Sequence, residues 1–121
     1  NRRDEASLRA GLDRLNEVRE RAANMRVGPV TSESFELAVD VGFMLVAAEA
    51  VLRGALAREE SRGAHYRTDF PEPDPDWRQN VYFDAADVGG MRLRTEPVDE
   101  PSEAVQAALD EGHELDYHQL E

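Results

Sequence analysis

The chain has 121 residues, with 14 basic side chains, 26 acidic side chains and a formal net charge of −12. This length provides the core of one domain at most. The absence of Cys excludes disulfides, thiolate zinc sites and Cys nucleophiles. No apolar run is long enough to span a bilayer, and no signal segment opens the chain, so we expect no direct membrane insertion. The acidity also disfavours nucleic acid as a partner.

The basic residues are all Arg, and Lys is absent. An acid-rich, Lys-free composition is typical of proteins from a salt-rich cytoplasm, where screening relaxes the repulsion between surface charges. A GC-rich genome alone could remove Lys, but it would not easily produce the excess of acids. The composition therefore predicts a halophilic source.

The first 30 residues, with a net charge of +2, show a helical pattern. Their apolar side chains recur three or four residues apart, which predicts a helix with one buried face. These side chains are Leu8, Leu12, Leu15, Val18, Ala22 and Met25. We expect the helix to begin after a cap at Asp4 and to end at Gly28-Pro29.

Residues 31–63, with a net charge of −3, predict a second, longer helix. Thr31 or Ser32 can cap its start. Arg58 and Arg62 in the last turns would complement the negative helix end, and Gly63 is a natural residue to follow it. The short connection between the two helices predicts an antiparallel helical hairpin.

The second helix is apolar on nearly every side: between Val41 and Leu52 its only charge is Glu49. The first helix offers one apolar stripe, which cannot cover such a helix. A later segment could fold back, the chain could self-associate, or the chain could be part of a larger protein. The start at Asn1, without Met, favours the last interpretation.

The segment after Gly63 carries a net charge of −11. Three Pro within residues 70–77 predict an extended stretch. Residues 78–83 and 91–95 resemble two strands, and the turn residues 87–90 between them favour a β-hairpin. We expect a short helix from Pro101 or Ser102 through Leu109, ended by Gly112, and then a frayed polar tail.

Few residues carry the pattern of a chemical site. The tail holds two His and two acids that could bind a metal: His113, Glu114, Asp116 and His118. Their spacing matches no rigid ligand geometry, so we interpret them as a solvated tail. Ser61 and His65 lie four residues apart across Gly63 and lack a third partner, which argues against a catalytic triad.

One dense polar cluster remains, in residues 58–71, where the apolar helix gives way to an extended segment. Its Arg side chains could satisfy the free carbonyl groups at the helix end. Alternatively, Arg62, His65 and Arg67 could bind carboxylates or backbone groups of another domain. The residues themselves favour neither interpretation.

This cluster reads R-E-E-S-R-G-A-H-Y-R-T-D-F-P. It resembles the R-x-E-S-R-G-A-H-x-R-x-D-[FY]-P signature in the C-terminal helical domain of succinate dehydrogenase and fumarate reductase flavoprotein subunits. L-aspartate oxidase, a close relative, shares the signature. The two helices and the later strand pair also resemble this family, whereas the last twenty residues match it less clearly.

The resemblance implies a mainly α fold: an antiparallel helical hairpin from a three-helix, spectrin-like bundle. An extended Pro-rich segment, a short β-hairpin and a short C-terminal helix would follow. The bundle helix preceding Asn1 would be missing, which would explain the uncovered faces of the second helix. We divide the chain into a helical hairpin, residues 1–63, and the signature segment, β-hairpin and acidic tail, residues 64–121, as one domain of a larger flavoprotein.

The resemblance further implies a parent enzyme of the tricarboxylic acid cycle and electron transport that interconverts succinate and fumarate. Its FAD would accept hydride and pass electrons to an iron–sulfur subunit and a quinone. The parent complex would lie in the cytoplasm, peripheral on the inner face of the cell membrane. The alternatives are the same domain of an L-aspartate oxidase and a free-standing acidic helical module that dimerises.

No position of the chain matches the family's catalytic or flavin-binding motifs, so we assign no catalytic, cofactor-binding or metal-binding residue. The partners expected are the flavin-binding domain of the same chain and the iron–sulfur subunit. The signature would fasten this domain to the flavin domain. The residues expected to do so are Arg58, Glu60, Arg62, His65, Arg67 and Asp69.

Overall fold

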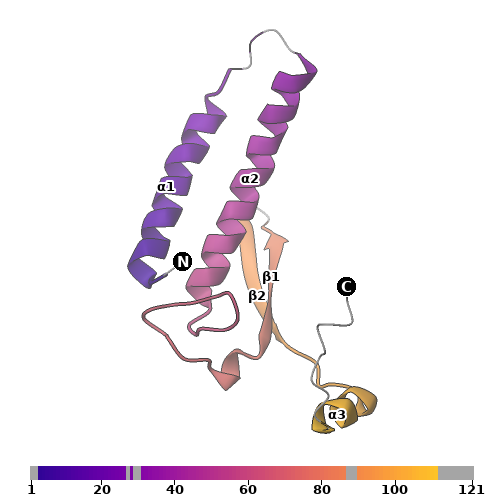
Figure 1. The fold of residues 1–121 in the computed structure, drawn as a ribbon. Coiled ribbons are helices and arrows are strands. Elements are labelled where there is room, and N and C mark those ends of the chain that lie inside the picture. Colours follow the sequence, from indigo (N-terminus) through magenta and orange to yellow (C-terminus); the bar gives the residue numbers. More distant parts are fainter. Residues whose placement is uncertain (1–2, 27, 29–30, 87–89, 112–121) are drawn as a thin grey trace, which may run out of the picture.

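The computed structural model describes residues 3–26, 28, 31–86 and 90–111. Two long helices, α1 (Glu5–Ala23) and α2 (Ser32–Ala57), lie side by side and run antiparallel (Figure 1). A single 3-10 turn, η1 (Pro75–Trp77), precedes the strands β1 (Gln79–Ala85) and β2 (Met91–Pro97). A short helix, α3 (Glu103–Asp110), follows them. The mainly helical fold and the helical hairpin predicted from the sequence are confirmed.

Both long helices begin at a capping box. The side chain of Asp4 accepts a hydrogen bond from the Ser7 N–H at the start of α1, and Thr31 does the same for Ser34 at the start of α2. In each case the Ser side chain accepts in return from the backbone N–H of the cap residue. These reciprocal bonds satisfy donors that a helix start leaves free. Asp4 and Thr31 are thus confirmed as cap residues.

Both long helices end earlier than predicted. The first stops at Ala23 rather than at Gly28, because the Asn24 side chain donates a 2.8 Å hydrogen bond to the Glu20 carbonyl and ends the helical ladder. The second stops at Ala57 rather than just before Gly63, and Arg58 is already extended. Gly63 instead occupies a tight turn with a φ of +56°, a conformation that favours glycine.

The prediction of an extended conformation for residues 70–77 is wrong for the last three of them. Pro75–Trp77 form a 3-10 turn. The fixed φ of Pro75 suits the first position of a helical turn, and the Asp74 side chain caps it by accepting a 2.9 Å hydrogen bond from the Asp76 N–H.

The β-hairpin is confirmed and pairs the two strands antiparallel, from Gln79 with Pro97 to Ala85 with Met91. It lies beside the C-terminal half of α2 (Figure 1). A Cβ atom added to Gly54 of α2 would stand 3.5 Å from the Phe83 ring, so the missing side chain lets the hairpin come close to the helix. The predicted turn residues Asp87, Val88 and Gly89 lie outside the described residues.

The third helix is capped by Ser102, whose side chain accepts a hydrogen bond from Val105, as predicted. Figure 1 shows α3 beyond the hairpin and apart from the two long helices, rather than between them. Its expected terminator Gly112 and the polar tail lie outside the described residues.

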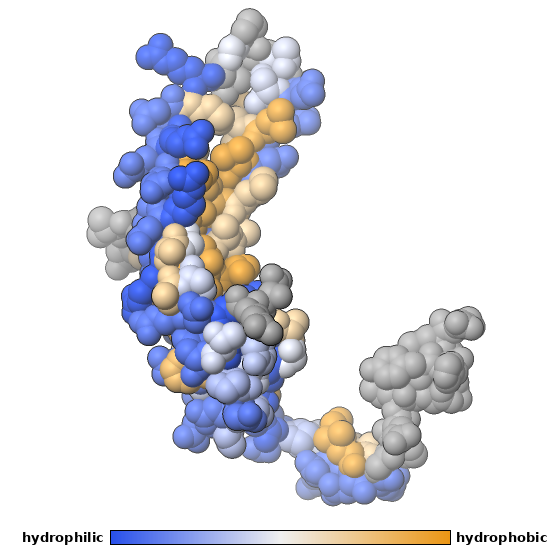
Figure 2. Space-filling view, turned by 60° about the vertical axis from the view of Figure 1, so that its left-hand side comes forward, coloured by the Kyte–Doolittle hydropathy of each residue, from blue (hydrophilic) through white to orange (hydrophobic). Residues whose placement is uncertain are grey.

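Burial follows an unusual pattern. Among the described residues, only two apolar side chains are buried, Leu8 and Ala55, whereas four polar or charged residues are buried. Many large apolar side chains of α2 are exposed: Phe35, Leu37, Val39, Phe43, Met44, Val46 and Val51. Figure 2 shows apolar side chains as an orange band along the helical hairpin. Among the described residues, the largest fully buried side chains are therefore those of Glu60 and Arg67, in the polar cluster at the end of α2.

Candidate functional site

Residues 58–71 fold into a compact turn at the end of α2. The backbone groups of Arg62 and His65 bond to each other twice, at 2.8 and 3.0 Å, around the turn at Gly63. The Ser61 N–H donates a 3.1 Å hydrogen bond to the Glu72 carbonyl, which draws the Pro-rich stretch alongside. The turn brings five charged side chains and His65 together, linked by ion pairs and by hydrogen bonds to the Arg58 carbonyl.

Arg67 lies at the centre of the cluster and is 1% exposed. Its Nη1 donates to the carbonyl oxygens of Ala55, Leu56 and Arg58, at distances of 3.3, 2.7 and 3.4 Å. These are carbonyl groups that a helix end leaves without partners. The guanidinium of Arg67 therefore terminates α2 from a position ten residues beyond it, as the first of the two interpretations of the cluster predicted.

The other donors of Arg67 bind one carboxylate. Its Nε and Nη2 donate to the two oxygens of Asp69, at 2.9 and 2.6 Å, in the two-pronged geometry typical of Arg–carboxylate pairs. The guanidinium also covers the ring of Phe70, 4.7 Å from its centroid. The hydrogen bonds from Arg67 hold the pKa of Asp69 well below its ordinary value.

Glu60 is fully buried and is held by cations on both sides. Arg62 donates to it at 2.9 and 3.0 Å, Arg58 pairs with its Oε1, and the Asp74 N–H donates to its Oε2 at 2.8 Å. These contacts, the Arg62 hydrogen bonds above all, lower the pKa of Glu60 to about 2 even though burial opposes them. Glu60 therefore stays ionised at neutral pH.

Ser61 is also buried, and its hydroxyl is occupied by backbone groups. It lies 2.7 Å from the carbonyl oxygen of Phe70 and accepts a 2.9 Å hydrogen bond from the Arg67 N–H. His65 binds elsewhere, since its Nδ1 accepts from Arg3 at 3.2 Å and its Nε2 lies 3.3 Å from the Arg58 carbonyl. These bonds fix the Ser–His pair in structural contacts rather than in a nucleophile–base arrangement.

The cluster also binds the start of α1. The Thr68 N–H donates a 2.7 Å hydrogen bond to the Arg3 carbonyl, and the Glu5 N–H donates a 2.9 Å bond to Asp69. The signature segment thus fastens the beginning of the first helix to the end of the second. Sequence reasoning did not assign Arg3 to the cluster, because a contact across 62 residues leaves no local pattern.

The structure brings together all six residues expected to dock. Arg67 and Glu60 are buried inside the chain, and the Arg58 side chain is only 18% exposed. Arg58 donates to the carbonyls of Trp77 and Gln79, at 2.9 and 2.6 Å, and its guanidinium lies 5.3 Å from the Trp77 ring centroid. Sequence reasoning missed these partners, although the Asp-Pro-Asp-Trp stretch was a usable turn signal.

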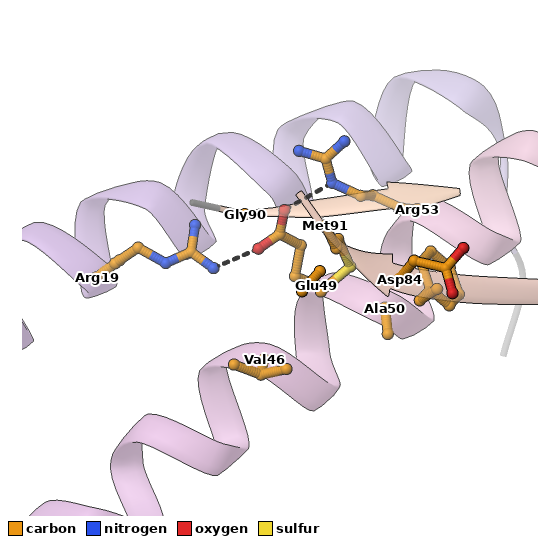
Figure 3. A pocket seen from close by; sticks show the side chains of 10 residues that line it. Arg19, Val46, Glu49, Ala50, Arg53, Asp84, Gly90 and Met91 are labelled. Carbon is orange, nitrogen blue, oxygen red and sulfur yellow. Dashed lines mark hydrogen bonds and ion pairs between the residues drawn. The ribbon is translucent and has the colours of Figure 1, made fainter. Parts of the chain in front are cut away.

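A second polar site lies where α1, α2 and the β-hairpin meet, in a pocket of about 550 Å³ (Figure 3). Glu49, the lone charge in the apolar part of α2, is buried there and binds Arg19 of α1 at 2.5 Å and Arg53 at 2.6 Å. Val46, Ala50 and Met91 supply the apolar lining. Both carboxylate oxygens are engaged, so this group joins the two helices rather than offering a free base.

The described residues include no group of three or more His, Asp or Glu side chains placed to hold a metal ion. The tail residues His113, Glu114, Asp116 and His118 lie outside them. Within the same part of the chain, no helix has the length and hydropathy needed to cross a bilayer. The polar cluster at the end of α2 is a network of ion pairs.

The family model described as "Fumarate reductase flavoprotein C-term" matches residues 2–109, which include both long helices, the polar cluster and the β-hairpin. The chain belongs to the family of fumarate reductase flavoprotein C-terminal domains. The resemblance predicted from the signature is confirmed at this level, and the family comprises flavoproteins.

The relatives of this chain include flavoproteins with different enzyme names. The fumarate reductase flavoprotein subunit of Haemophilus influenzae is 30% identical over 93% of this chain and 20% of its own length. An L-aspartate oxidase of Pyrococcus furiosus is 42% identical over 67% of this chain and 13% of its own length. The solved structure of Mycobacterium smegmatis Sdh1 in complex with UQ1 matches with a TM-score of 0.75 and 34% identity, over 91% of this chain and 19% of that one.

The chain therefore spans a fifth or less of the length of these flavoprotein relatives. Among the described elements, no glycine-rich turn joins a strand to a helix.

Proposed function

We propose that this chain is the non-catalytic C-terminal domain of an FAD-dependent flavoprotein that interconverts succinate and fumarate. FAD and substrate would be held by the remaining four fifths of the parent, which would pass electrons to an iron–sulfur subunit and a quinone. The family match and the share of the relatives that the chain spans support this proposal.

We infer the role of the domain within that parent from one observation. Charged residues of the polar cluster are buried, whereas many large apolar side chains of α2 are exposed. Glu60 and Arg67 are enclosed, whereas Phe43 and Met44 of α2 are 70% and 68% exposed. Extensive exposed apolar surface marks an interface. The domain would therefore bury these exposed side chains of α2 against the rest of the flavoprotein.

The exposed residues of α2 fall into two stripes. Leu37, Met44 and Val51 repeat every seven residues along one, and Phe35, Val39, Phe43 and Val46 follow the other. A bundle helix preceding residue 1 would cover one of these stripes and complete a three-helix bundle. Residues 1–63 would then belong to that bundle, and residues 64–121 would form the segment that fastens it.

Within the signature segment, the six residues would divide the work of docking. Arg58, Glu60, Arg67 and Asp69 would fix the shape of the turn through the contacts described above. Arg62, whose side chain is 48% exposed, and the half-buried His65 would face the flavin-binding domain. The segment would thus act as a rigid latch between the helical hairpin and the flavin domain.

An L-aspartate oxidase parent is the alternative that one comparison favours, because the relative from Pyrococcus furiosus matches at the higher identity. The succinate–fumarate assignment is favoured by the match over nearly the whole chain, which includes the hairpin after the Pro-rich stretch. Turnover assays of the full-length flavoprotein with succinate and with L-aspartate distinguish the two.

The parent complex would be peripheral on the cytoplasmic face of the cell membrane, because the quinone lies in the membrane and this domain would not enter it.

A salt-rich cytoplasm would account for the net charge of −12. We expect the melting temperature of the chain to rise between 0.2 and 2 M KCl as screening relieves the repulsion. A flat or falling melting temperature would refute salt adaptation.

The substitution Arg62→Ala tests the docking role in the full-length flavoprotein. We expect limited proteolysis to release the C-terminal domain several-fold faster and the yield of assembled complex to fall. Arg92→Ala, at an exposed position of β2, is the matched control and should change neither. The faster release must also be larger than the loss of stability of the isolated Arg62→Ala chain can explain. Equal release rates for Arg62→Ala and Arg92→Ala would contradict the proposal.

A further inference from the structure

A cleft of about 380 Å³ opens between the signature turn and the start of the hairpin. Three arginines and a histidine line it, together with an apolar wall: Arg58, Arg62, Arg78, His65, Trp77 and Val98. The chain as a whole has a net charge of −12, so this concentration of positive guanidinium groups contrasts with its overall charge. We propose that the cleft binds a carboxylate: an Asp or Glu side chain from a polypeptide segment outside these 121 residues. This inference rests on the proposed docking role and assigns the chemistry of the contact.

The guanidinium groups of Arg58 and Arg62 and the backbone of Arg78 are held in place before any partner arrives. Arg58 is fixed by the carbonyls of Trp77 and Gln79, and Arg62 donates to the Asp74 carbonyl at 3.1 Å as well as to Glu60. The Arg78 N–H donates to the Pro75 carbonyl at 3.1 Å, and its own carbonyl accepts from the Val98 N–H at 3.1 Å. Such fixed positions reduce the entropy lost on binding.

Their charge is only partly compensated. The buried carboxylate of Glu60 is shared between Arg58 and Arg62. Arg78 has one carboxylate nearby, that of Glu100, at 3.7 Å and with a side chain 84% exposed, which is a weak surface pair. Within the described part of the chain, the hydrogen bonds of Arg62 engage its Nε and Nη2 and leave its Nη1 without a partner. The Nη1 of Arg62 and the guanidinium of Arg78 are therefore available to a further anion.

The chemistry of the cleft favours a protein carboxylate over other anions. A guanidinium matches a carboxylate with two parallel hydrogen bonds, and Trp77 and Val98 offer apolar surface to the methylene groups of an acidic side chain. The net charge of the chain repels polyphosphates such as nucleic acid. A free small anion would meet only two available arginines, whereas a carboxylate on a docked surface arrives at a high effective concentration.

A zero-length crosslink tests this contact, because the chain contains no Lys. The substitution Arg78→Lys in the full-length flavoprotein places a single amine of this chain in the cleft. Treatment with a carbodiimide then joins that amine to a carboxylate in direct contact with it, and mass spectrometry locates the bond. We expect an amide bond from position 78 to an Asp or Glu outside residues 1–121. Arg92→Lys, on the exposed surface of β2, is the matched control and should not join the same acid.

Crosslinks from position 78 only to acids within the chain, such as Glu100, would overturn the inference, and so would equal crosslinking of the two variants. Docking is measured separately in the same sample by hydroxyl-radical footprinting of Phe43 and Met44. Protection of these side chains without the crosslink would refute the carboxylate site and leave the docking role standing. Full oxidation of both would refute the docking role itself.

Discussion

Arg67 carries its charge inside the protein because each nitrogen of its guanidinium has an acceptor. The side chain combines a two-pronged pair with Asp69 and the end of a helix, whose carbonyl groups attract a cation. Removing it would leave the carboxylate and the carbonyl groups without their partner. Breaking a fully buried pair costs about 3–5 kcal/mol, and the Asp69 side chain is 28% exposed, so the lower end of this range applies.

We therefore expect Arg67→Ala to lower the free energy of unfolding of the chain by about 3 kcal/mol, measured by urea denaturation followed by circular dichroism. Arg14→Ala removes an exposed pair with Glu17 and is the matched control, with an expected change below about 0.5 kcal/mol. A similar loss for both variants would show that Arg67 does not stabilise the end of α2.

Glu60 makes the stability of the cluster depend on pH. Its pKa is lowered from 4.5 to about 2 in the folded chain, so its ionised form favours folding. This stabilisation is fully present above the unfolded-state pKa and disappears as the pH falls from about 4.5 to about 2. Glu60→Gln removes the charge and with it this dependence.

We expect Glu60→Gln to destabilise the chain at pH 7 and the gap to wild type to shrink steadily as the pH is lowered through this window. Urea titrations of both proteins between pH 7 and pH 2 measure the gap. A gap that is constant across this range would mean that the ion pairs of Glu60 contribute nothing to stability.

The residue types in the cluster could be predicted from the sequence, but their partners could not. The signature marked Arg58, Glu60 and Arg67 as a unit. That Arg67 bonds to carbonyls of α2, and that His65 meets Arg3, depends on how the chain folds back on itself. Such contacts are set by tertiary structure, for which the local pattern holds no signal.

The boundaries of the helices differ in the same way: their starts depend on local sequence, whereas the end of α2 depends on a tertiary contact. The helix starts at Asp4 and Thr31 were predictable, because a capping box is written within four residues. The end of α2 was predicted several residues too late, because Arg58 and Gly63 look like ordinary helix-end residues. The helix stops at Ala57 instead, where Arg67 approaches from beyond it.

Two glycines of this region predict opposite responses to Ala. A Cβ at Gly42, in the middle of α2, would meet nothing within 4 Å, so Gly42→Ala should stabilise the chain by about 0.5–1 kcal/mol through helix propensity. A Cβ at Gly63 also has space, but the φ of +56° disfavours any side chain, so Gly63→Ala should destabilise by about 1 kcal/mol. Thermal unfolding of the two variants measures both signs, and changes of the same sign would contradict this account.

For the whole molecule, the exposed face of α2 predicts how the chain behaves alone. Without its covering partner, we expect the isolated chain to self-associate in proportion to its concentration. Replacing Phe43 and Met44 by Ser should shift sedimentation velocity profiles toward the monomer. The matched control replaces Val105 and Leu109 of α3, which are 52% and 64% exposed, and should leave association unchanged. Equal effects of the two pairs would remove α2 as the associating surface.

The fold class was predictable at this scale because periodicity and turn residues are local, and the surplus of apolar residues on the second helix already indicated that the first helix would leave much of it uncovered. The position of α3 away from the helical hairpin was not predictable, since its Val105 and Leu109 would equally suit a buried face.

The bonds from Thr68 to Arg3 and from Glu5 to Asp69 close the helical hairpin into a loop that is covalent at one end and non-covalent at the other. Of the six residues that are buried in the described part of the chain, five belong to the helix ends and the signature segment of the non-covalent end: Leu8, Ala55, Glu60, Ser61 and Arg67. Local opening should therefore begin near Phe35 and reach the polar end last. We expect backbone amides of α2 to exchange with deuterium progressively more slowly from its start to Ala57, and a uniform rate along the helix would contradict this order. In this domain, the charged end would be the last to unfold.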